Sequence, residues 1–353
     1  MKKNILFISR NMGIGGTEKV ILDLCYEFKD YFNNIIVCSA GGENVSNLEK
    51  LGIKHILIPD ISKINYIQLL KTRRKIKEIV KEYDINIIHT HHRMAAFLCY
   101  RMKNIYLINN LHNTFYDKKM FSKLILERYL NIAVGKVVFD NAIKDIGISS
   151  RKVRLIENSI NTKFNFEKIN LFEENNKNKI KNFVFVGRLE EQKGLDILID
   201  SFIDYFSNYN NVSLYIYGDG SQKNELMNKC INIKNISFMG YTNNPLNVIS
   251  QCDLLILPSR WEGLPLNILE AIALGKPVLC SNIPSNIEII EDGFNGFVFE
   301  NESVASLIQK IDEFLNYKDM EIIKKNAVAT FNSRYNYRNY INKYLAVYEE
   351  MRK

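Results

Sequence analysis

The amino-acid sequence predicts two α/β domains, each built as a doubly wound parallel sheet covered by helices. The chain has 353 residues, which suggests two domains at roughly 100–200 residues each. Short runs rich in Ile and Val alternate with segments of helical period, and an Asn-, Lys- and Glu-rich stretch at residues 163–181 interrupts this alternation. Apolar strands separated by helices are typical of parallel sheets buried on both faces.

The expected elements follow the same alternation in both halves. Strands are expected at 5–9, 35–39, 55–58, 85–89, 106–110, 153–156, 183–187, 213–217, 236–239, 253–257 and 278–280. Helices are expected at 17–30, 66–83, 94–102, 121–131, 195–206, 221–229, 265–274, 304–315 and 337–351. We therefore expect a first domain at 1–162, a linker at 163–181, a second domain at 182–335, and a C-terminal helix within 336–353 that packs back toward the first domain.

Charge divides unevenly between the two halves. Residues 1–180 hold 30 basic and 18 acidic side chains, whereas residues 181–353 hold 17 and 21, so the balances are +12 and −4. Either different partners or a Lys-rich composition explains this. The six cysteines are scattered without a CxxC pair, which indicates a reducing compartment. No stretch approaches the ~20 apolar residues that span a bilayer, so we expect a cytoplasmic protein that is soluble or lies on a membrane surface.

Two loops after expected strands carry the first candidate binding residues. Gly15 and Gly16 lie in the segment Gly-Ile-Gly-Gly-Thr-Glu, where glycines allow close approach and a helix start favours an anion. The alternative is an ordinary tight turn, because the segment is neither a P-loop nor a complete GxGxxG. Arg188 and Lys193 flank the loop that follows the strand expected at 183–187, where two cations can converge on a diphosphate. The alternative there is a solvated surface pair.

The segment 259–271 carries two carboxylates at a strand-to-helix turn. Glu262 lies in the loop, and Glu270 lies inside a mostly apolar helix where a buried carboxylate needs a partner. A salt-bridged helix carboxylate and an N-terminal helix charge are the structural alternatives. The backbone N–H groups at the helix start can bind an anionic or hydroxyl-rich ligand; they belong to Gly263, Leu264, Leu266 and Asn267.

Histidines gather after two neighbouring strands. His89, His91 and His92 lie at one strand end and His112 lies after the next. A zinc site, a role facing a substrate, and ordinary packing all remain open, although no Cys or carboxylate stands at ligand spacing.

These segments resemble a known family. The motifs are Val-Gly-Arg-Leu…Lys-Gly at 186–194, Gly-Asp-Gly at 218–220, Glu-Gly-Leu-Pro…Glu-Ala…Gly-Lys-Pro-Val at 262–278, Gly-Gly-Thr-Glu at 15–18, and Asn158. Over nearly the whole chain, they resemble the retaining nucleotide-sugar glycosyltransferases of family 4. The resemblance implies the GT-B fold, with two Rossmann-like domains facing a central cleft, the first binding the acceptor and the second the donor.

The resemblance also implies roles for individual residues. Arg188 and Lys193 hold the donor diphosphate, and Glu270 binds the donor ribose. Glu262 and His112 face the transferred sugar, with the amides of 263–267 near Glu262. Gly15 and Gly16 approach donor or acceptor from the opposite domain. The segments 158–161 and 283–288 depart from the family pattern, which leaves the identity of the donor sugar open.

The implied reaction is transfer of a hexose or N-acetylhexosamine with retention, from a UDP-sugar or from GDP-mannose, in bacterial surface polysaccharide or glycolipid synthesis. No Asp-x-Asp motif appears, so neither a metal nor another cofactor is expected. An epimerase or a phosphorylase of the same fold is an alternative. A basic nucleic-acid-binding protein and a dinucleotide dehydrogenase are others, although no nucleic-acid-binding motif or complete glycine fingerprint supports them.

One basic helix suggests where the acceptor lies. Five cations fall within seven positions of an amphipathic segment, and such a helix can lie on anionic lipid. A lipid-linked acceptor at the inner face of the cytoplasmic membrane then follows; a solvated helix face over a core stripe is the alternative. The five are Lys71, Arg73, Arg74, Lys75 and Lys77.

Overall fold

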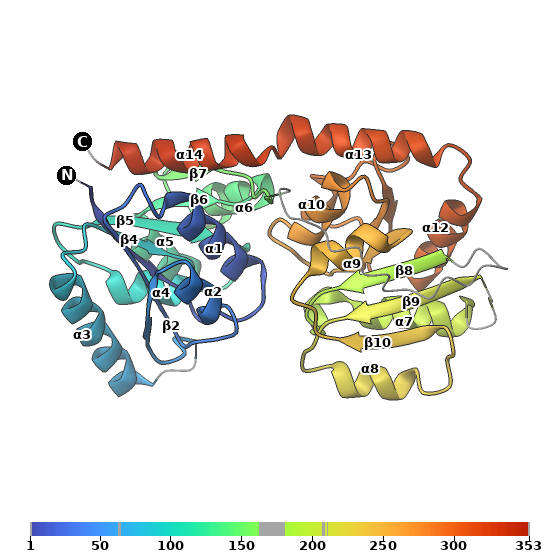
Figure 1. Cartoon of the computed structure of the whole chain (residues 1–353), viewed down its shortest axis with the longest axis horizontal. Helices are drawn as coiled ribbons and strands as arrows, with labels where there is room; N and C mark the ends of the chain where they lie inside the picture. The colour runs from blue at the N-terminus through green and yellow to red at the C-terminus, as the bar shows by residue number, and fades with distance from the viewer. Residues whose placement is uncertain (1, 63–64, 162–180, 207–208, 210, 352–353) are drawn as a thin grey trace. The chain divides into compact units, whose positions relative to one another are not determined.

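The computed structural model describes residues 2–62, 65–161, 181–206, 209 and 211–351, which form two compact units (Figure 1). Unit 1 comprises Met1–Asn158 with Arg338–Lys353, and unit 2 comprises Ser159–Tyr337. The linker predicted at 163–181 lies outside the described residues, except for Lys181, which begins the first strand of unit 2.

Unit 1 holds a seven-stranded sheet in which every pair is parallel. The order is β3-β2-β1-β4-β5-β6-β7. The inner strand β1 is buried along its whole length, as expected for a strand covered on both faces. The strands are β1 (Asn4–Ile8), β2 (Asn34–Ser39), β3 (Lys54–Leu57), β4 (Ile87–Thr90), β5 (Tyr106–Leu111), β6 (Leu130–Ala133) and β7 (Val153–Leu155).

Helices connect these strands, and α3 packs against α4, which packs against α5. The C-terminal helix α14 (Tyr337–Glu350) joins unit 1 through buried tyrosines and Val347. The others are α1 (Gly16–Phe28), α2 (Val45–Lys50), α3 (Tyr66–Glu82), α4 (Arg93–Cys99), α5 (Lys119–Leu126), α6 (Lys136–Asp140), a π-helical turn at Asn141–Asp145 and a 3-10 turn at Ser150–Lys152.

The helix predicted at 121–131 is wrong at its C-terminal end. Helix α5 ends at Leu126, and strand β6 begins at Leu130. The side chain of Asn131 explains the switch, because its amide donates to the carbonyl oxygens of Leu126, Tyr129 and Lys152 and so fixes the turn and the neighbouring strand.

Unit 2 holds a six-stranded parallel sheet in the order β10-β9-β8-β11-β12-β13. Its strands are β8 (Lys181–Val186), β9 (Val212–Tyr217), β10 (Ile236–Gly240), β11 (Leu254–Leu257), β12 (Val278–Ser281) and β13 (Phe297–Phe299). Its helices are a 3-10 turn at Glu191–Lys193, α7 (Leu195–Asp204), α8 (Lys223–Lys229), α9 (Pro245–Gln251), α10 (Leu266–Ala273), α11 (Pro284–Ile287), α12 (Val304–Asn316) and α13 (Met320–Arg334).

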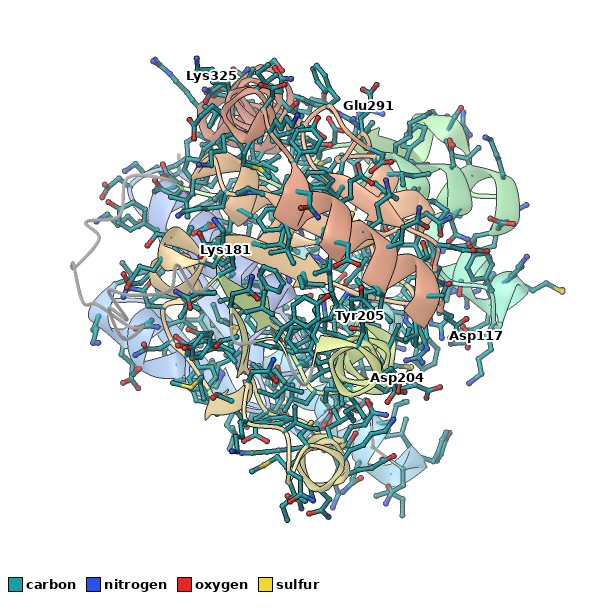
Figure 2. All side chains as sticks on the ribbon, turned by 90° about the vertical axis from the view of Figure 1, so that its right-hand side faces the viewer. Asp117, Lys181, Asp204, Tyr205, Glu291 and Lys325 are labelled. Atoms are coloured by element: carbon teal, nitrogen blue, oxygen red, sulfur yellow. The ribbon has the colours of Figure 1, made fainter. Side chains whose placement is uncertain are left out.

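One strand and three α-helices of unit 2 were not predicted: β13, α9, α11 and α13. Strand β13 is only three residues long, and α9 is seven. Helix α13 buries Ile323, Ala327 and Phe331 and exposes residues such as Lys325 (Figure 2). Its apolar stripe is narrow, so helical periodicity marks it weakly.

The order of the strands in each sheet places loops that carry candidate site residues side by side. Strands β8 and β11 are direct neighbours, so the loops 187–194 and 258–265 leave the same edge of the sheet together. Strands β4 and β5 are likewise neighbours in unit 1, which brings His91 and His112 to one edge. Ligands of such sheets bind at these carboxyl ends.

Candidate active site

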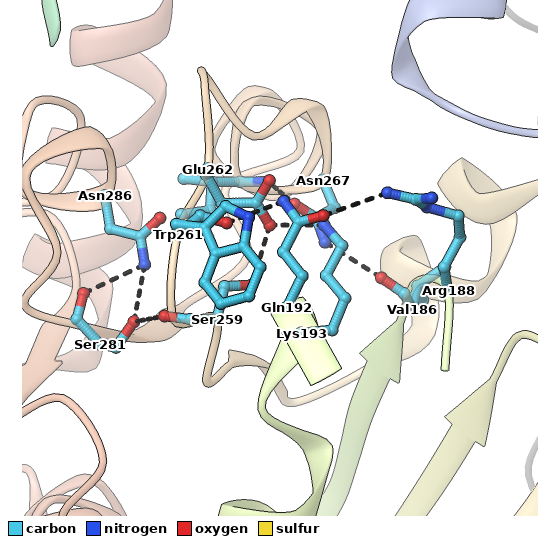
Figure 3. A network of polar contacts seen from close by, with 11 residues as sticks. Val186, Arg188, Gln192, Lys193, Ser259, Trp261, Glu262, Asn267, Ser281 and Asn286 are labelled. Atoms are coloured by element: carbon cyan, nitrogen blue, oxygen red, sulfur yellow. Dashed lines mark hydrogen bonds and ion pairs between the residues drawn. The ribbon is translucent and has the colours of Figure 1, made fainter. Parts of the chain in front are cut away.

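The loops after β8 and β11 in unit 2 are joined by a set of hydrogen bonds (Figure 3). The backbone N–H of Arg260 donates to the Gln192 carbonyl at 2.8 Å, and Gln192 Nε2 donates to the Trp261 carbonyl at 2.8 Å. Gly194 has φ +61°, and a Cβ there would lie 2.1 Å from the Pro258 carbonyl oxygen. A glycine is therefore required where the two loops touch.

Lys193 and Glu262 form an ion pair at this junction. Lys193 Nζ lies 2.5 Å from Glu262 Oε1, and Ser259 Oγ donates to the same oxygen at 2.8 Å. The two charged side chains are only 14% and 9% exposed. A pair with so little solvent contact is held firmly, because removing either partner leaves an uncompensated charge.

Arg188 is exposed at the start of the first loop. Its Nη2 donates to Gln192 Oε1 at 3.1 Å, and Gln192 in turn bonds the Trp261 carbonyl. Lys193 turns instead toward Glu262 (Figure 3). The guanidinium of Arg188 has five N–H donors and gives one to Gln192, so it keeps donors for an anion.

Helix α10 begins beside these loops. Pro265 is its N-cap rather than its first residue, and Asn267 Nδ2 donates to the Val186 carbonyl at 3.0 Å, which ties α10 to the end of β8. Glu270 is buried on this helix, with 3% of its surface exposed. Within the described residues, four backbone N–H groups at the helix start donate to no oxygen; they belong to Gly263, Leu264, Leu266 and Asn267.

Arg260 is a structural residue of the site that sequence reasoning missed. Its guanidinium forms a two-pronged contact with Asp196 at 2.9 and 2.7 Å, and it also bonds Glu302 and the Glu191 carbonyl. The hydrogen bonds that Arg260 donates to Asp196 and Glu302 raise the pKa of its guanidinium despite its partial burial. Its position next to Glu262 was visible in the sequence, but Asp196 lies 64 positions away.

In unit 1, His112 lies directly after β5 and contacts His91. Their Nε2 and Nδ1 atoms are 3.0 Å apart, and the rings stack at 5.2 Å. Burial lowers the pKa of His112 to about 3 and that of His89 to about 4, so both are neutral near pH 7. His92 instead caps α4, since its Nδ1 accepts the Met94 N–H at 3.2 Å.

Gly15 and Gly16 begin α1 after the loop that follows β1. Gly15 is the N-cap residue in extended backbone, and the Lys19 N–H donates to its carbonyl at 3.1 Å. A Cβ at Gly15 would lie 2.6 Å from Glu18 Oε2. Because that oxygen ends a flexible side chain and the backbone is extended, the local structure does not itself require glycine at position 15.

The basic helix predicted near residue 71 is α3, and its cations differ in how they are held. Arg73 Nη2 donates to the Tyr100 carbonyl at 2.8 Å, Arg74 pairs with Glu78, and Lys75 donates to the Leu57 carbonyl. Lys71 and Lys77 are exposed.

Neither a metal cluster nor a membrane-spanning helix is found in the part of the chain that the structure describes. No three His, Cys, Asp or Glu side chains there group in a way that could hold a metal ion. No helix there combines the length and the apolar character needed to cross a bilayer.

Comparisons with known proteins agree on one family. The family described as "Glycosyltransferase Family 4" matches residues 14–164, and "Glycosyl transferases group 1" matches residues 167–330. The O-antigen biosynthesis glycosyltransferase WbnH of Escherichia coli is 29% identical, over 91% of this chain and 94% of that protein. The UDP-Gal:alpha-D-GlcNAc-diphosphoundecaprenol alpha-1,3-galactosyltransferase of Escherichia coli is 25% identical, over 96% and 94%.

Solved structures agree on the fold. A glycosyltransferase from Rickettsia africae superposes with a TM-score of 0.82 at 23% identity, covering 100% of this chain and 99% of that one. HepE from Anabaena, in complex with UDP and glucose, also gives 0.82, at 19% identity over 99% and 100%. Both the sequence families and the fold lead to one conclusion: the chain belongs to glycosyltransferase family 4 and has the GT-B fold.

Proposed function

We propose that the protein is a retaining glycosyltransferase that moves a hexose or an N-acetylhexosamine from a nucleotide sugar to a lipid-linked glycan. A UDP-sugar is the favoured donor and GDP-mannose is the alternative. The product belongs to a surface polysaccharide such as capsule, exopolysaccharide or O-antigen, or to a glycolipid. Two named relatives support the donor and the acceptor: the galactosyltransferase whose name pairs UDP-Gal with a diphosphoundecaprenol-linked GlcNAc, and HepE, crystallised with UDP-glucose.

The joined loops of unit 2 are the observation that carries this proposal. They bring an exposed Arg188, a paired Lys193 and the start of α10 to one sheet edge. Cations and aligned N–H groups of this kind stabilise the charge of a departing nucleoside diphosphate. In our proposal Arg188, Lys193 and the amides of 263–267 bind the diphosphate. Glu270 binds the ribose, so unit 2 is the donor domain.

Glu262 has a positioning and electrostatic role in this proposal. Its Oε1 already accepts from Lys193 and Ser259, which makes it a poor free nucleophile. We therefore favour front-face displacement, in which the leaving phosphate oxygen takes the acceptor proton. Two cations then replace a divalent metal, and no cofactor is needed. In unit 1, which binds the acceptor, His112, Gly15 and Gly16 contact the reacting sugars.

A membrane partner follows from two helices of unit 1. Helix α3 exposes Tyr66 (75%), Ile67 and Leu70 beside its cations, and α5 exposes Met120 (88%) and Leu124 (61%). Both helices pack against α4, so they belong to one helical layer. Exposed apolar side chains among lysines fit an anionic lipid surface. In our proposal the protein is peripheral at the inner face of the cytoplasmic membrane, and nucleic acid is not a partner.

Product analysis tests the proposal. The protein is incubated with UDP-hexoses or GDP-mannose, with and without a polyprenyl-diphosphate-linked sugar, and products are followed by proton NMR. A new glycosidic bond with the anomeric configuration of the donor, formed equally well in EDTA, is expected. An epimerised sugar formed from donor alone would instead show an epimerase, and an inverted product would exclude retention.

A further inference from the structure

A row of buried aromatic and imidazole rings runs through the carboxyl edge of the unit 1 sheet. His89 packs against Phe7 at 5.2 Å between ring centroids and against His91 at 4.6 Å, and His91 stacks on His112 at 5.2 Å. The C-terminal helix α14 closes this row through Tyr344 and Tyr348, whose rings are fully buried. The row therefore links the end of the chain to His112.

The hydrogen bonds around His89 fix where its proton lies. Asn110 Nδ2 donates to the Tyr344 hydroxyl at 2.6 Å, so Asn110 Oδ1 is the atom that faces His89 Nε2, at 2.9 Å. An amide oxygen only accepts, hence His89 Nε2 carries the hydrogen. His89 Nδ1 then accepts from the Tyr348 hydroxyl at 3.0 Å. The ring is a single neutral tautomer.

Either His91 or His112 can be the donor of the hydrogen bond between them, and burial decides which one it is. His91 Nδ1 and His112 Nε2 are 3.0 Å apart, which leaves room for one hydrogen. His91 Nε2 is buried and has no partner among the described residues. A hydrogen on Nε2 would be an orphaned buried donor, which proteins tolerate less than an orphaned acceptor. His91 therefore carries its hydrogen on Nδ1 and donates it to His112 Nε2.

We propose that His91 is a positioning residue that holds His112 in the neutral tautomer protonated at Nδ1. Because His112 Nε2 accepts from His91, the other nitrogen must carry the hydrogen. His112 is half-buried, and its Nδ1 has no hydrogen-bond partner among the described residues. His112 thus offers a ligand a fixed N–H donor. Such a donor can bind an oxygen of the transferred sugar, but it cannot act as a base that removes a proton. This role for the ligand rests on the proposed function.

The tautomer can be measured without any turnover. The chain has five histidines, so a proton–nitrogen long-range spectrum of the ¹⁵N-histidine-labelled protein can be assigned by single substitutions. We expect His112 to carry its hydrogen on Nδ1 and His89 on Nε2. A His112 protonated at Nε2, or exchanging between tautomers, would overturn the proposal.

Two variants at His91 then separate positioning from packing. His91→Asn keeps an N–H donor close to the place of Nδ1, whereas His91→Leu keeps bulk and loses the donor. We expect His91→Leu to release the His112 tautomer and to lower kcat about tenfold at nearly unchanged donor KM, as for one lost hydrogen bond. His91→Asn should restore most of kcat. Equal losses in both variants, with melting temperatures equally lowered, would show a packing role.

The outcomes remain distinct from those of the proposed function. A correct tautomer in a protein that transfers no sugar would refute the proposed function and leave the positioning intact. A correct tautomer in an active protein whose His112→Phe variant keeps its kcat would refute the donor role of His112.

Discussion

Lys193 Nζ and Glu262 Oε1 lie 2.5 Å apart, so the cation expected to bind a diphosphate is already paired with a carboxylate of the same site. Ser259 donates to that carboxylate oxygen as well. In the proposed donor site, a phosphate would meet a lysine whose charge is partly compensated, beside a more exposed Arg188. The two cations are therefore unequal, and their variants should differ.

The Lys193→Ala variant should lose more activity than Arg188→Ala. Removing Lys193 takes away a cation and also leaves the negative charge of Glu262 uncompensated beside the phosphates. We expect kcat/KM to fall about 10²–10³-fold for Lys193→Ala and about tenfold for Arg188→Ala. Circular dichroism should show both variants folded. Lys229→Ala is the matched control, because it removes a lysine of α8 that pairs with Asp200 of α7.

A double variant tests the coupling directly. Lys193→Ala with Glu262→Gln should recover part of the donor affinity that Lys193→Ala loses, because the uncompensated charge is gone. Additive losses in the two single variants and the double variant would contradict an electrostatic link between these residues. Unchanged donor turnover in both Lys193→Ala and Arg188→Ala would refute the donor site itself.

Arg260 should matter for the shape of the site without touching a substrate. Arg260→Lys keeps the charge but cannot reproduce the fork that holds Asp196. Since both side chains keep some solvent contact, we expect a loss of about 1–2 kcal/mol in the free energy of unfolding and a raised KM for the donor. Differential scanning calorimetry and donor titration measure the two effects. A higher KM without any loss of stability would argue instead for direct donor contact.

The stability of unit 1 should fall as the pH drops below about 6.5, because its buried histidines stay neutral in the folded state. The pKa values of His89 and His112 are lowered by burial to about 4 and about 3, below the ~6.5 of an unfolded histidine. Between these values the unfolded chain binds protons that the folded chain does not, so stability falls as the pH drops below about 6.5. The slope approaches about 1.4 kcal/mol per pH unit for each such histidine.

The window from pH 6.5 to 5 isolates this effect. Carboxylates with lowered pKa values, such as Asp117 and Asp196, act at lower pH, since their unfolded values lie near 4. Urea unfolding at several pH values in this window should give a smaller pH slope for His112→Phe than for the parent protein. An identical slope would mean that His112 titrates normally in the folded state.

Membrane binding should depend on apolar side chains of both α3 and α5. Replacing Met120 and Leu124 by Ser, or Tyr66 and Ile67 by Ser, should each reduce flotation with phosphatidylglycerol vesicles about tenfold or more, since each pair removes much exposed apolar surface. Ile231→Ser, at a 78% exposed isoleucine of unit 2, is the control. No flotation of the parent protein even at low salt would exclude the lipid surface.

The sequence predicted the alternation of strands and helices because buried parallel strands and amphipathic helices leave local patterns. It also marked Lys193 and Glu262, since both stand in recognisable loops after strands. Their pairing, by contrast, joins residues 69 positions apart and has no local signal. Two further contacts were not predicted for the same reason. They join Arg260 to Asp196, and His89 to Tyr348, which lies 259 positions away. Strand β6 was missed because its apolar run adjoins a helix without an intervening Gly or Pro.

The Tyr348 hydroxyl should influence turnover from a helix at the far end of the sequence. Tyr348→Phe removes the hydroxyl that His89 Nδ1 accepts from, whereas Tyr129→Phe removes a buried hydroxyl that donates to the Ala96 carbonyl at 2.7 Å, away from the histidine row. Each change should lower the free energy of unfolding by about 1 kcal/mol. Only Tyr348→Phe should also lower kcat, because the ring of His89 supports His91 at 4.6 Å. Steady-state kinetics of both variants at matched folded fractions measures this difference. Equal kcat values would show that α14 contributes to packing alone.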